Sequence, residues 1–81
     1  MKVRVEFFSR LKEIAGASDL ELALPENATV GELFAKLSSD YPLLRDFEQS
    51  VLFGIGVEFV DPQHRLHEGD IVAIMPPVQG G

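Results

Sequence analysis

Apolar and polar residues alternate along the first positions of the chain. Between residues 2 and 8 every second residue is apolar, and Phe8 is the single apolar residue on the other side. A second alternating run covers residues 20–24 and ends before Pro25. The two runs predict two strands, each with one buried face.

Two other segments have apolar residues at helical spacing. The first, over residues 9–16, begins with a serine that is a candidate N-cap and ends with a glycine. The second begins at Val30 directly after Thr29, which forms a capping-box pattern with Glu32, and it ends at the Tyr41-Pro42 pair. A short helix and a longer amphipathic helix are therefore predicted.

The second half of the chain predicts three further strands, over residues 51–56, 57–60 and 71–75. The last of them is apolar on both faces, which is typical of a central strand. The order of elements indicates an α+β fold of β-grasp type, with a mixed sheet of about five strands packed on one main helix plus short helical segments. We predict a domain over residues 1–75 and an extended tail over residues 76–81.

Size and composition restrict the possible functions. The chain has 81 residues, of which 46% are hydrophobic, as expected for one small globular domain. The net charge is −6, from 13 acidic and 7 basic residues, so nucleic acids and anionic membrane surfaces are not expected as partners. No apolar run approaches the ~18 residues of a membrane span, and we expect a cytoplasmic protein. The absence of cysteine excludes a thiol nucleophile, a disulfide scaffold and a zinc site with cysteine ligands.

Candidate catalytic and metal-binding residues within the domain have simpler interpretations. His64 and His67 are three residues apart, but they lie in a polar stretch that predicts a solvated turn and no metal site. Asp19 and Glu21 share one face of a predicted strand, which we interpret as solvated. The segment Gly54-Ile55-Gly56 lacks the rest of a phosphate-binding motif and indicates close backbone packing. No serine lies in a nucleophile-elbow motif, so we predict no catalytic site within the domain.

The C-terminal tail has a more unusual composition. After the last predicted strand the sequence reads Pro76-Pro77-Val78-Gln79-Gly80-Gly81. Prolines stiffen a chain, and glycines carry no side chain, so such a tail forms a thin arm that fits a narrow channel in a partner. An ionised carboxylate is a poor electrophile, and chemistry on it requires ATP-dependent activation by another protein. A flexible end without function is the alternative.

The β-grasp order of elements, together with the ending Gly80-Gly81, resembles the ubiquitin-like sulfur-carrier proteins, and among them the small subunits of molybdopterin synthases. Residues 7–16 are similar to the first strand and short helix of that family, and residues 66–73 are similar to the turn before its last strand. The resemblance implies that an E1-like adenylyltransferase uses ATP to adenylate the carboxylate of Gly81. A sulfur donor protein then converts this carboxylate to a thiocarboxylate.

The resemblance also implies a partner and a role for each tail residue. The large subunit of molybdopterin synthase would receive the tail, and the sulfur would pass to cyclic pyranopterin monophosphate to form the dithiolene of molybdopterin in molybdenum cofactor biosynthesis. Gly81 would carry the sulfur and Gly80 would give clearance. The remaining tail residues would guide the arm: Pro76, Pro77, Val78 and Gln79. The chain itself would bind no cofactor or metal, and a heterotetramer of two small and two large subunits is implied.

Phe8, Phe59 and Met75 are candidates for the partner interface, because Phe8 and Met75 fall on the outward side of their strands and Phe59 on a short edge segment. The alternative is that Phe59 and Met75 are ordinary core residues. Three other functions stay open: a sulfur carrier for another acceptor (thiamine thiazole, a tungsten pterin or a tRNA base), a ubiquitin-like protein modifier, and a plain β-grasp binding module.

Overall fold

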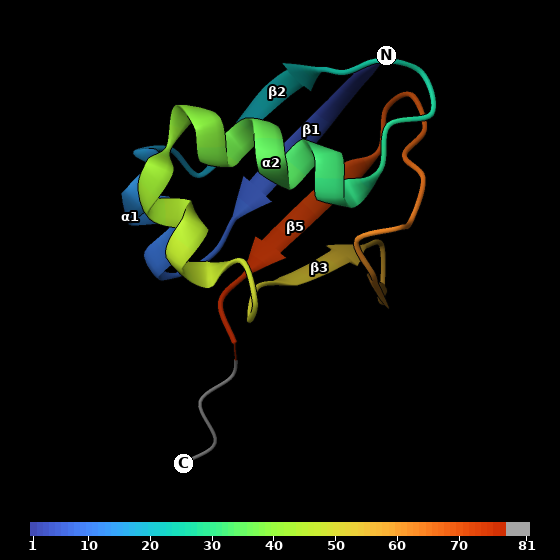
Figure 1. Cartoon of the computed structure of the whole chain (residues 1–81). Helices are drawn as coiled ribbons and strands as arrows, with labels where there is room; N and C mark the ends of the chain where they lie inside the picture. The colour runs from blue at the N-terminus through green and yellow to red at the C-terminus, as the bar shows by residue number, and fades with distance from the viewer. Residues whose placement is uncertain (78–81) are drawn as a thin grey trace.

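The computed structural model describes residues 1–77 and has the predicted order of elements. The strands form one mixed sheet, and the longer helix packs across it (Figure 1). The elements in chain order are β1 (Lys2–Phe7), α1 (Arg10–Ala15), β2 (Asp19–Ala23), α2 (Val30–Asp40), the 3-10 helix η1 (Pro42–Phe47), β3 (Leu52–Ile55), β4 (Glu58–Val60) and β5 (Ile71–Met75). The predicted β-grasp fold is confirmed.

The five strands are arranged in the order β2-β1-β5-β3-β4. The central strand β5 runs parallel to β1, with Val5 opposite Val72, and antiparallel to β3. The two hairpin pairs, β1 with β2 and β3 with β4, are antiparallel. The prediction that the last apolar run is a central strand is therefore confirmed.

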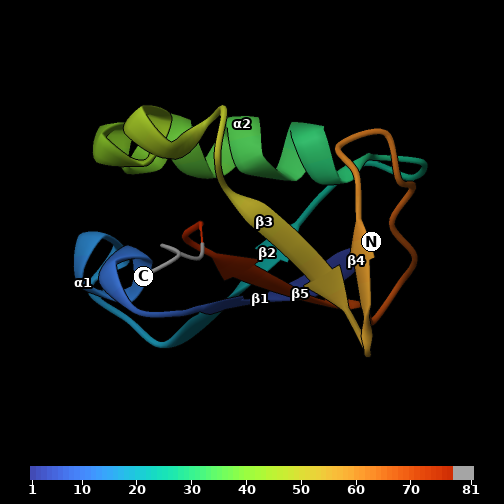
Figure 2. The ribbon, with the colours of Figure 1, turned by 90° about the horizontal axis from the view of Figure 1, so that it is seen from below.

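The core lies between the sheet and α2, which Figure 2 shows along one side of the sheet. Alternate residues of β1 and β5 point toward α2 because strand side chains alternate between faces. Phe34 of α2 contacts Phe53 of β3 edge to face, with ring centroids 5.6 Å apart. The fully buried side chains are Leu11, Leu33, Leu37, Leu44, Ile74, Val3, Val5, Val30 and Val72.

The predicted capping of α2 is confirmed, whereas that of α1 is partly wrong. The Thr29 hydroxyl accepts a hydrogen bond from the Glu32 backbone N–H at 3.2 Å, and the Glu32 carboxylate accepts one from the Thr29 N–H at 3.0 Å. Gly16 ends α1 in the left-handed conformation, as predicted. Ser9 occupies the N-cap position of α1 but makes no side-chain cap, because its backbone adopts φ 52° and ψ −130° instead of an extended conformation.

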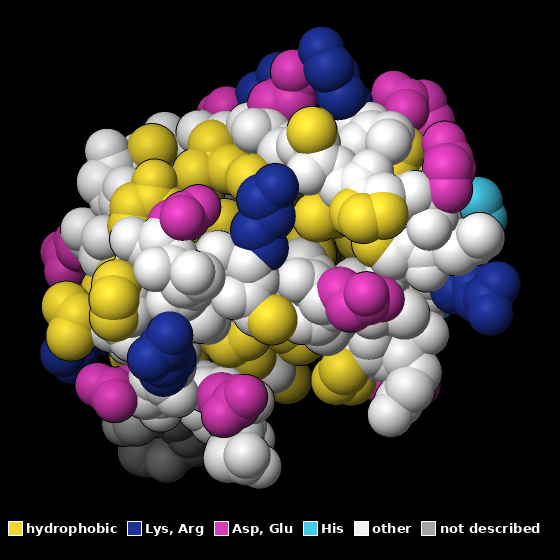
Figure 3. All heavy atoms as spheres, turned by 45° about the horizontal axis from the view of Figure 1, so that its top comes forward, with side chains coloured by type: hydrophobic (Ala, Val, Ile, Leu, Met, Phe, Trp, Pro, Cys, Tyr) yellow, Lys and Arg dark blue, Asp and Glu magenta, His cyan; other side chains and the backbone are white. Residues whose placement is uncertain are grey.

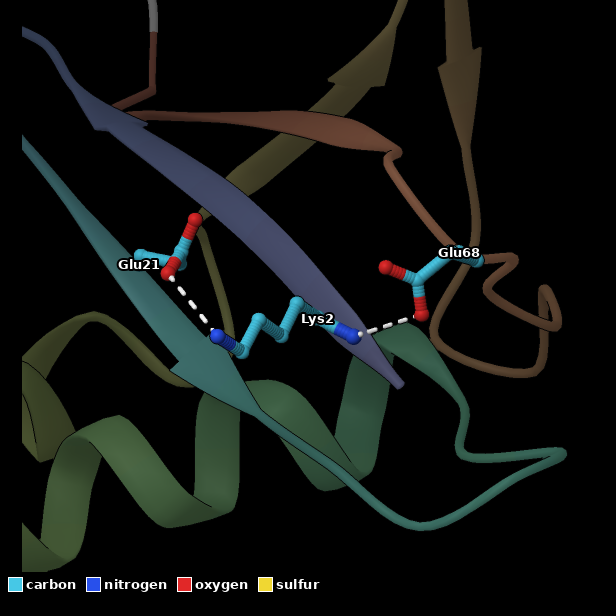
Figure 4. A network of polar contacts seen from close by, with 3 residues as sticks. All are labelled: Lys2, Glu21 and Glu68. Carbon is cyan, nitrogen blue, oxygen red and sulfur yellow. Dashed lines mark hydrogen bonds and ion pairs between the residues drawn. The ribbon is translucent and has the colours of Figure 1, made fainter.

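Lys2 connects the start of β1 to both neighbouring segments (Figure 4). Its backbone N–H donates a hydrogen bond to the Glu68 carboxylate at 2.9 Å, and its carbonyl accepts one from the Gly69 N–H at 2.8 Å. Its ammonium lies 3.9 Å from the Glu21 carboxylate of β2, an exposed ion pair that contributes little to stability. The two backbone bonds hold the turn that leads into β5 and thereby set where β5 begins.

Candidate functional site

The side of the sheet that faces away from α2 carries large apolar side chains. Within residues 1–77, no helix crosses this side of the sheet (Figure 2). Phe8 is 44% exposed and Phe59 is 73% exposed, so both project into solvent. Met75 is half-buried on the same side. An exposed apolar surface of this kind is typical of a site that binds another protein.

These three side chains line one shallow groove of about 320 Å³. They come from the end of β1, from β4 and from the end of β5, so the three predicted interface residues lie together although the sequence separates them widely. The other lining residues are Glu6, Gly54, Gly56, Val57, Glu58 and Ala73. Sequence reasoning missed these residues as parts of a site.

The floor of the groove depends on Gly54 of β3. Gly54 lies opposite Ala73 on one side and Phe59 on the other in the strand register. A Cβ atom at Gly54 would lie 3.3 Å from the Met75 Cε and 3.5 Å from the Glu58 carbonyl oxygen. The predicted close packing is confirmed at Gly54, where a side chain would fill part of the groove. It is wrong at Gly56, where a Cβ atom would have no neighbour within 4 Å and the glycine serves a turn with φ 64°. The signal in the sequence was a glycine on the outward face of a strand.

The position of Phe8 is fixed by the backbone around it. Its N–H donates to the Ile74 carbonyl oxygen at 3.1 Å, which extends the pairing of β1 with β5 by one residue. Its carbonyl oxygen accepts from the Leu11 N–H at 3.1 Å, within the first turn of α1. These bonds keep the Phe8 ring on the outward side of the sheet.

The C-terminal tail leaves the sheet at the groove. Met75 lines the groove, and Pro76 and Pro77, both half-buried, follow it directly. The predicted tail residues Val78, Gln79, Gly80 and Gly81 lie outside the described residues. The division of the chain into a domain over 1–75 and a tail over 76–81 stays a prediction, as do the roles of the tail residues.

The other candidate residues of the domain have structural partners or are exposed. Within the part of the chain that the structure describes, there is no group of three or more histidine, aspartate or glutamate side chains that could hold a metal ion. The Nδ1 of exposed His67 lies 3.8 Å from an Asp70 carboxylate oxygen. Asp19 accepts a hydrogen bond from Arg4 at 2.8 Å.

No helix among residues 1–77 is long and apolar enough to span a membrane.

Charges are mixed on the face that Figure 3 shows. Acidic and basic side chains alternate there with apolar ones, and neither sign forms a large continuous region. A binding site for a phosphate backbone needs a basic region, and this face has none.

Comparison with known proteins places the chain in a family. A family model described as the ThiS family matches residues 5–81. The chain belongs to the ThiS family. This match covers every residue that lines the groove and the whole predicted tail.

Curated relatives of this ThiS-family chain have two kinds of name, sulfur carrier subunit and modifier protein. The molybdopterin synthase sulfur carrier subunit of Mycobacterium tuberculosis is 36% identical over 83 residues, covering 100% of this chain and 99% of that protein. The protein of the same name from Chlamydomonas reinhardtii is 32% identical, covering 100% of both chains. Small archaeal modifier protein 3 of Haloferax volcanii is 28% identical over 92 residues, again covering 100% of both.

A solved structure has the same fold as this ThiS-family chain. The putative molybdopterin converting factor subunit 1 of Pyrococcus furiosus has a TM-score of 0.86 and 27% sequence identity, covering 96% of this chain and 99% of that chain. The resemblance to the ubiquitin-like sulfur carriers that the sequence indicated is therefore confirmed at the level of family and fold.

Proposed function

We propose that this chain is the sulfur-carrier subunit of a molybdopterin synthase, with the carboxylate of Gly81 as the carrier group. Two findings support the proposal: the full-length similarity to sulfur-carrier subunits, and the sequence ending in Gly80 and Gly81. The chain has no cysteine, and a carrier role for the Gly81 carboxylate explains how it would handle sulfur without a thiol.

The reaction balances with ATP and a sulfur donor as co-reactants. The Gly81 carboxylate attacks the α-phosphate of ATP and releases pyrophosphate, which leaves an acyl adenylate. Sulfur at the oxidation level of sulfide then displaces AMP and leaves a thiocarboxylate. The thiocarboxylate sulfur bonds to a carbon of cyclic pyranopterin monophosphate and displaces an oxygen substituent from that carbon, and water then cleaves the bond between the sulfur and the Gly81 carbonyl carbon. Because a dithiolene contains two sulfur atoms, two loaded chains each deliver one. The last step restores the carboxylate and leaves sulfur on the substrate.

The position of the groove is the observation that carries this proposal. The groove holds the exposed apolar side chains of Phe8 and Phe59, and the predicted tail follows directly after Met75, which lines the groove. A partner bound at the groove therefore meets the start of the tail. The large synthase subunit is the proposed partner, and it supplies the general acid, the general base and the phosphate-binding residues. An E1-like adenylyltransferase and a sulfur donor protein are the partners of the loading steps.

Intact-mass measurement tests the loading steps. The chain is incubated with an activating enzyme, ATP and a sulfur donor, and we expect a mass change of one oxygen replaced by sulfur, located at Gly81 by fragmentation. A chain that lacks only Gly81 is the matched control and stays unmodified. Failure of the complete chain to gain sulfur under these conditions would refute the proposal.

The transfer step needs its own measurement. The sulfur-loaded chain is mixed with the large synthase subunit and cyclic pyranopterin monophosphate. We expect the thiocarboxylate to return to a carboxylate and the dithiolene product to form together. Loss of the thiocarboxylate without any dithiolene would indicate hydrolysis, and it would favour a carrier for another acceptor, such as thiamine thiazole, a tungsten pterin or a tRNA base.

A ubiquitin-like modifier is the second candidate function. The similarity to small archaeal modifier protein 3 over the full length of both chains favours it. In that case the activated Gly81 carbonyl would be attacked by a lysine amine of a target protein, which releases AMP and forms an isopeptide bond. Isopeptide-linked conjugates in the source cells would support this function, and a thiocarboxylate without conjugates would exclude it.

A further inference from the structure

The outward side of the sheet, opposite α2, divides into a charged half and an apolar half. The charged half is formed by β1 and β2. The Lys2 ammonium lies 3.9 Å from the Glu21 carboxylate (Figure 4), and the Arg4 guanidinium lies 2.8 Å from the Asp19 carboxylate. These groups balance one another within the chain, so they need no charge from a partner. Glu6, the next outward residue of β1, lies at the boundary between the two halves, opposite β5.

The apolar half consists of the groove and of the outward residues of β5. Val72 and Ile74 of this strand are fully buried, so Ile71, Ala73 and Met75 point outward. All three are apolar, and Ile71 is 49% exposed although β5 is the central strand. Ala73 and Met75 line the groove, whereas Ile71 does not. The apolar surface therefore continues along β5 beyond the groove.

The neighbours of Ile71 leave its side chain uncovered. On β1 it lies opposite Arg4, whose guanidinium donates to a carboxylate of β2, on the side away from β5. On the other side, Val72 pairs with Ile55 of β3, and the residue after Ile55 is Gly56, which has no side chain. A Cβ atom at Gly56 would have no neighbour within 4 Å, so this position is open to solvent.

The length of the tail limits where a partner that receives it can lie. Six residues follow Met75, and an extended chain spans at most about 3.6 Å per residue, so the Gly81 carboxylate can reach at most about 22 Å from Met75. Ile71 precedes Met75 by four residues on the same strand, a distance of about 13 Å. A specific interface covers about 800 Å² of each partner, which is roughly 30 Å across. A partner of this size that lies on the groove extends far enough to cover Ile71.

We propose that Ile71 is a further contact residue for the large synthase subunit, which covers the apolar half with an apolar surface of its own and leaves the ion pairs of β1 and β2 in solvent. The inference rests on the proposed function. The core of an interface is poor in charge and rich in apolar side chains, as this half is. Among residues 1–77, all but the second of the exposed large apolar side chains belong to it: Phe8, Leu43, Val57, Phe59 and Ile71.

Calorimetric titration with the large synthase subunit tests this inference. Ile71→Ala is compared with the wild type and with Leu43→Ala. The control removes a 64% exposed aliphatic side chain from η1, on the α2 side of the sheet (Figure 2). From the half of the Ile71 side chain that a partner can still cover, we expect Ile71→Ala to raise the Kd about three- to tenfold. The Kd of Leu43→Ala should be that of the wild type.

Melting temperatures separate a binding role from a structural one. Ile71→Thr keeps the β-branched shape that suits a strand, so we expect it to melt close to the wild-type temperature and still to bind more weakly. If both Ile71 variants melt at lower temperature while their Kd is unchanged, Ile71 is structural and the inference is overturned.

A further variant tests the boundary between the two halves. Lys2→Ala/Glu21→Ala removes an ion pair without changing the net charge, and we expect an unchanged Kd. A rise as large as that of Ile71→Ala would place the charged half inside the interface and contradict the inference.

The outcomes also separate this inference from the proposed function. If the wild type and both Ile71 variants bind the large subunit equally well, the proposed function stands and the inference fails. The inference also fails if Ile71→Ala changes only the self-association of the free chain, since the surface would then bind a second copy. If the large subunit binds none of the chains, both fail.

Discussion

Phe59 and Phe53 form a matched pair that tests which side of the sheet binds a partner. They lie on the neighbouring strands β4 and β3 but face opposite sides of the sheet. Phe59 is 73% exposed, whereas Phe53 is 6% exposed and contacts Phe34. The same substitution, phenylalanine to alanine, therefore removes a surface ring in one variant and a core ring in the other.

The structure gives different expected losses of stability for the two variants. Full burial of a phenylalanine stabilises a fold by about 1.5–3 kcal/mol, and Phe59 has roughly a quarter of its surface covered, so Phe59→Ala should lower the free energy of unfolding by about 0.4–0.8 kcal/mol. Phe53→Ala leaves a cavity and removes the edge-to-face contact at 5.6 Å, so it should cost about 3–5 kcal/mol.

The expected effects on binding have the opposite order. A phenylalanine buries about 150–250 Å² when covered, and roughly three quarters of Phe59 is free to be covered by a partner. At about 25 cal/mol per Å², this area corresponds to at most about 3–5 kcal/mol. Ordering costs reduce the gain, and we expect Phe59→Ala to cost about 2 kcal/mol, or about a 30-fold higher Kd.

Urea unfolding and calorimetric titration with the large synthase subunit measure the two effects. If Phe53→Ala does not fold, Phe53→Leu replaces it, with an expected loss of about 1–2 kcal/mol and a nearly unchanged Kd. The reasoning is refuted if Phe59→Ala loses more than about 2 kcal/mol of stability while its Kd stays that of the wild type, since Phe59 would then act as a core residue.

Four further changes have defined outcomes. Thr29→Ala removes the capping box of α2 and should lower the free energy of unfolding in urea by about 0.5–2 kcal/mol, without changing sulfur loading. Gly54→Ala should cost about 1 kcal/mol or less because the flexible end of Met75 can move, yet it narrows the groove and should raise the Kd. Phe8→Asp should raise the Kd for the large subunit more than it lowers the melting temperature. Deletion of Gly81 should abolish thiocarboxylate formation, measured as intact mass, at an unchanged melting temperature, since the core of the described residues ends at residue 74.

The sequence alone determined the elements, and it predicts the chemistry of the ending. Strand periodicity, helical spacing and the capping pair Thr29 and Glu32 act over a few residues, so they can be read along the chain. The resemblance of the ending to sulfur carriers likewise depends on adjacent residues. The cap predicted at Ser9 was wrong because side-chain capping requires an extended backbone, and the entry into α1 has a positive φ there.

Only the tertiary structure decided which apolar residues are core and which are surface. Phe59 and Met75 fit both descriptions in the sequence, because hydrophobicity does not report which side of a sheet a helix covers. The parallel pairing of β1 with β5 and the hairpin of β3 and β4 put Phe8, Met75 and Phe59 on the uncovered side. Such neighbours arise from contacts between distant segments, and no local pattern of residues records them.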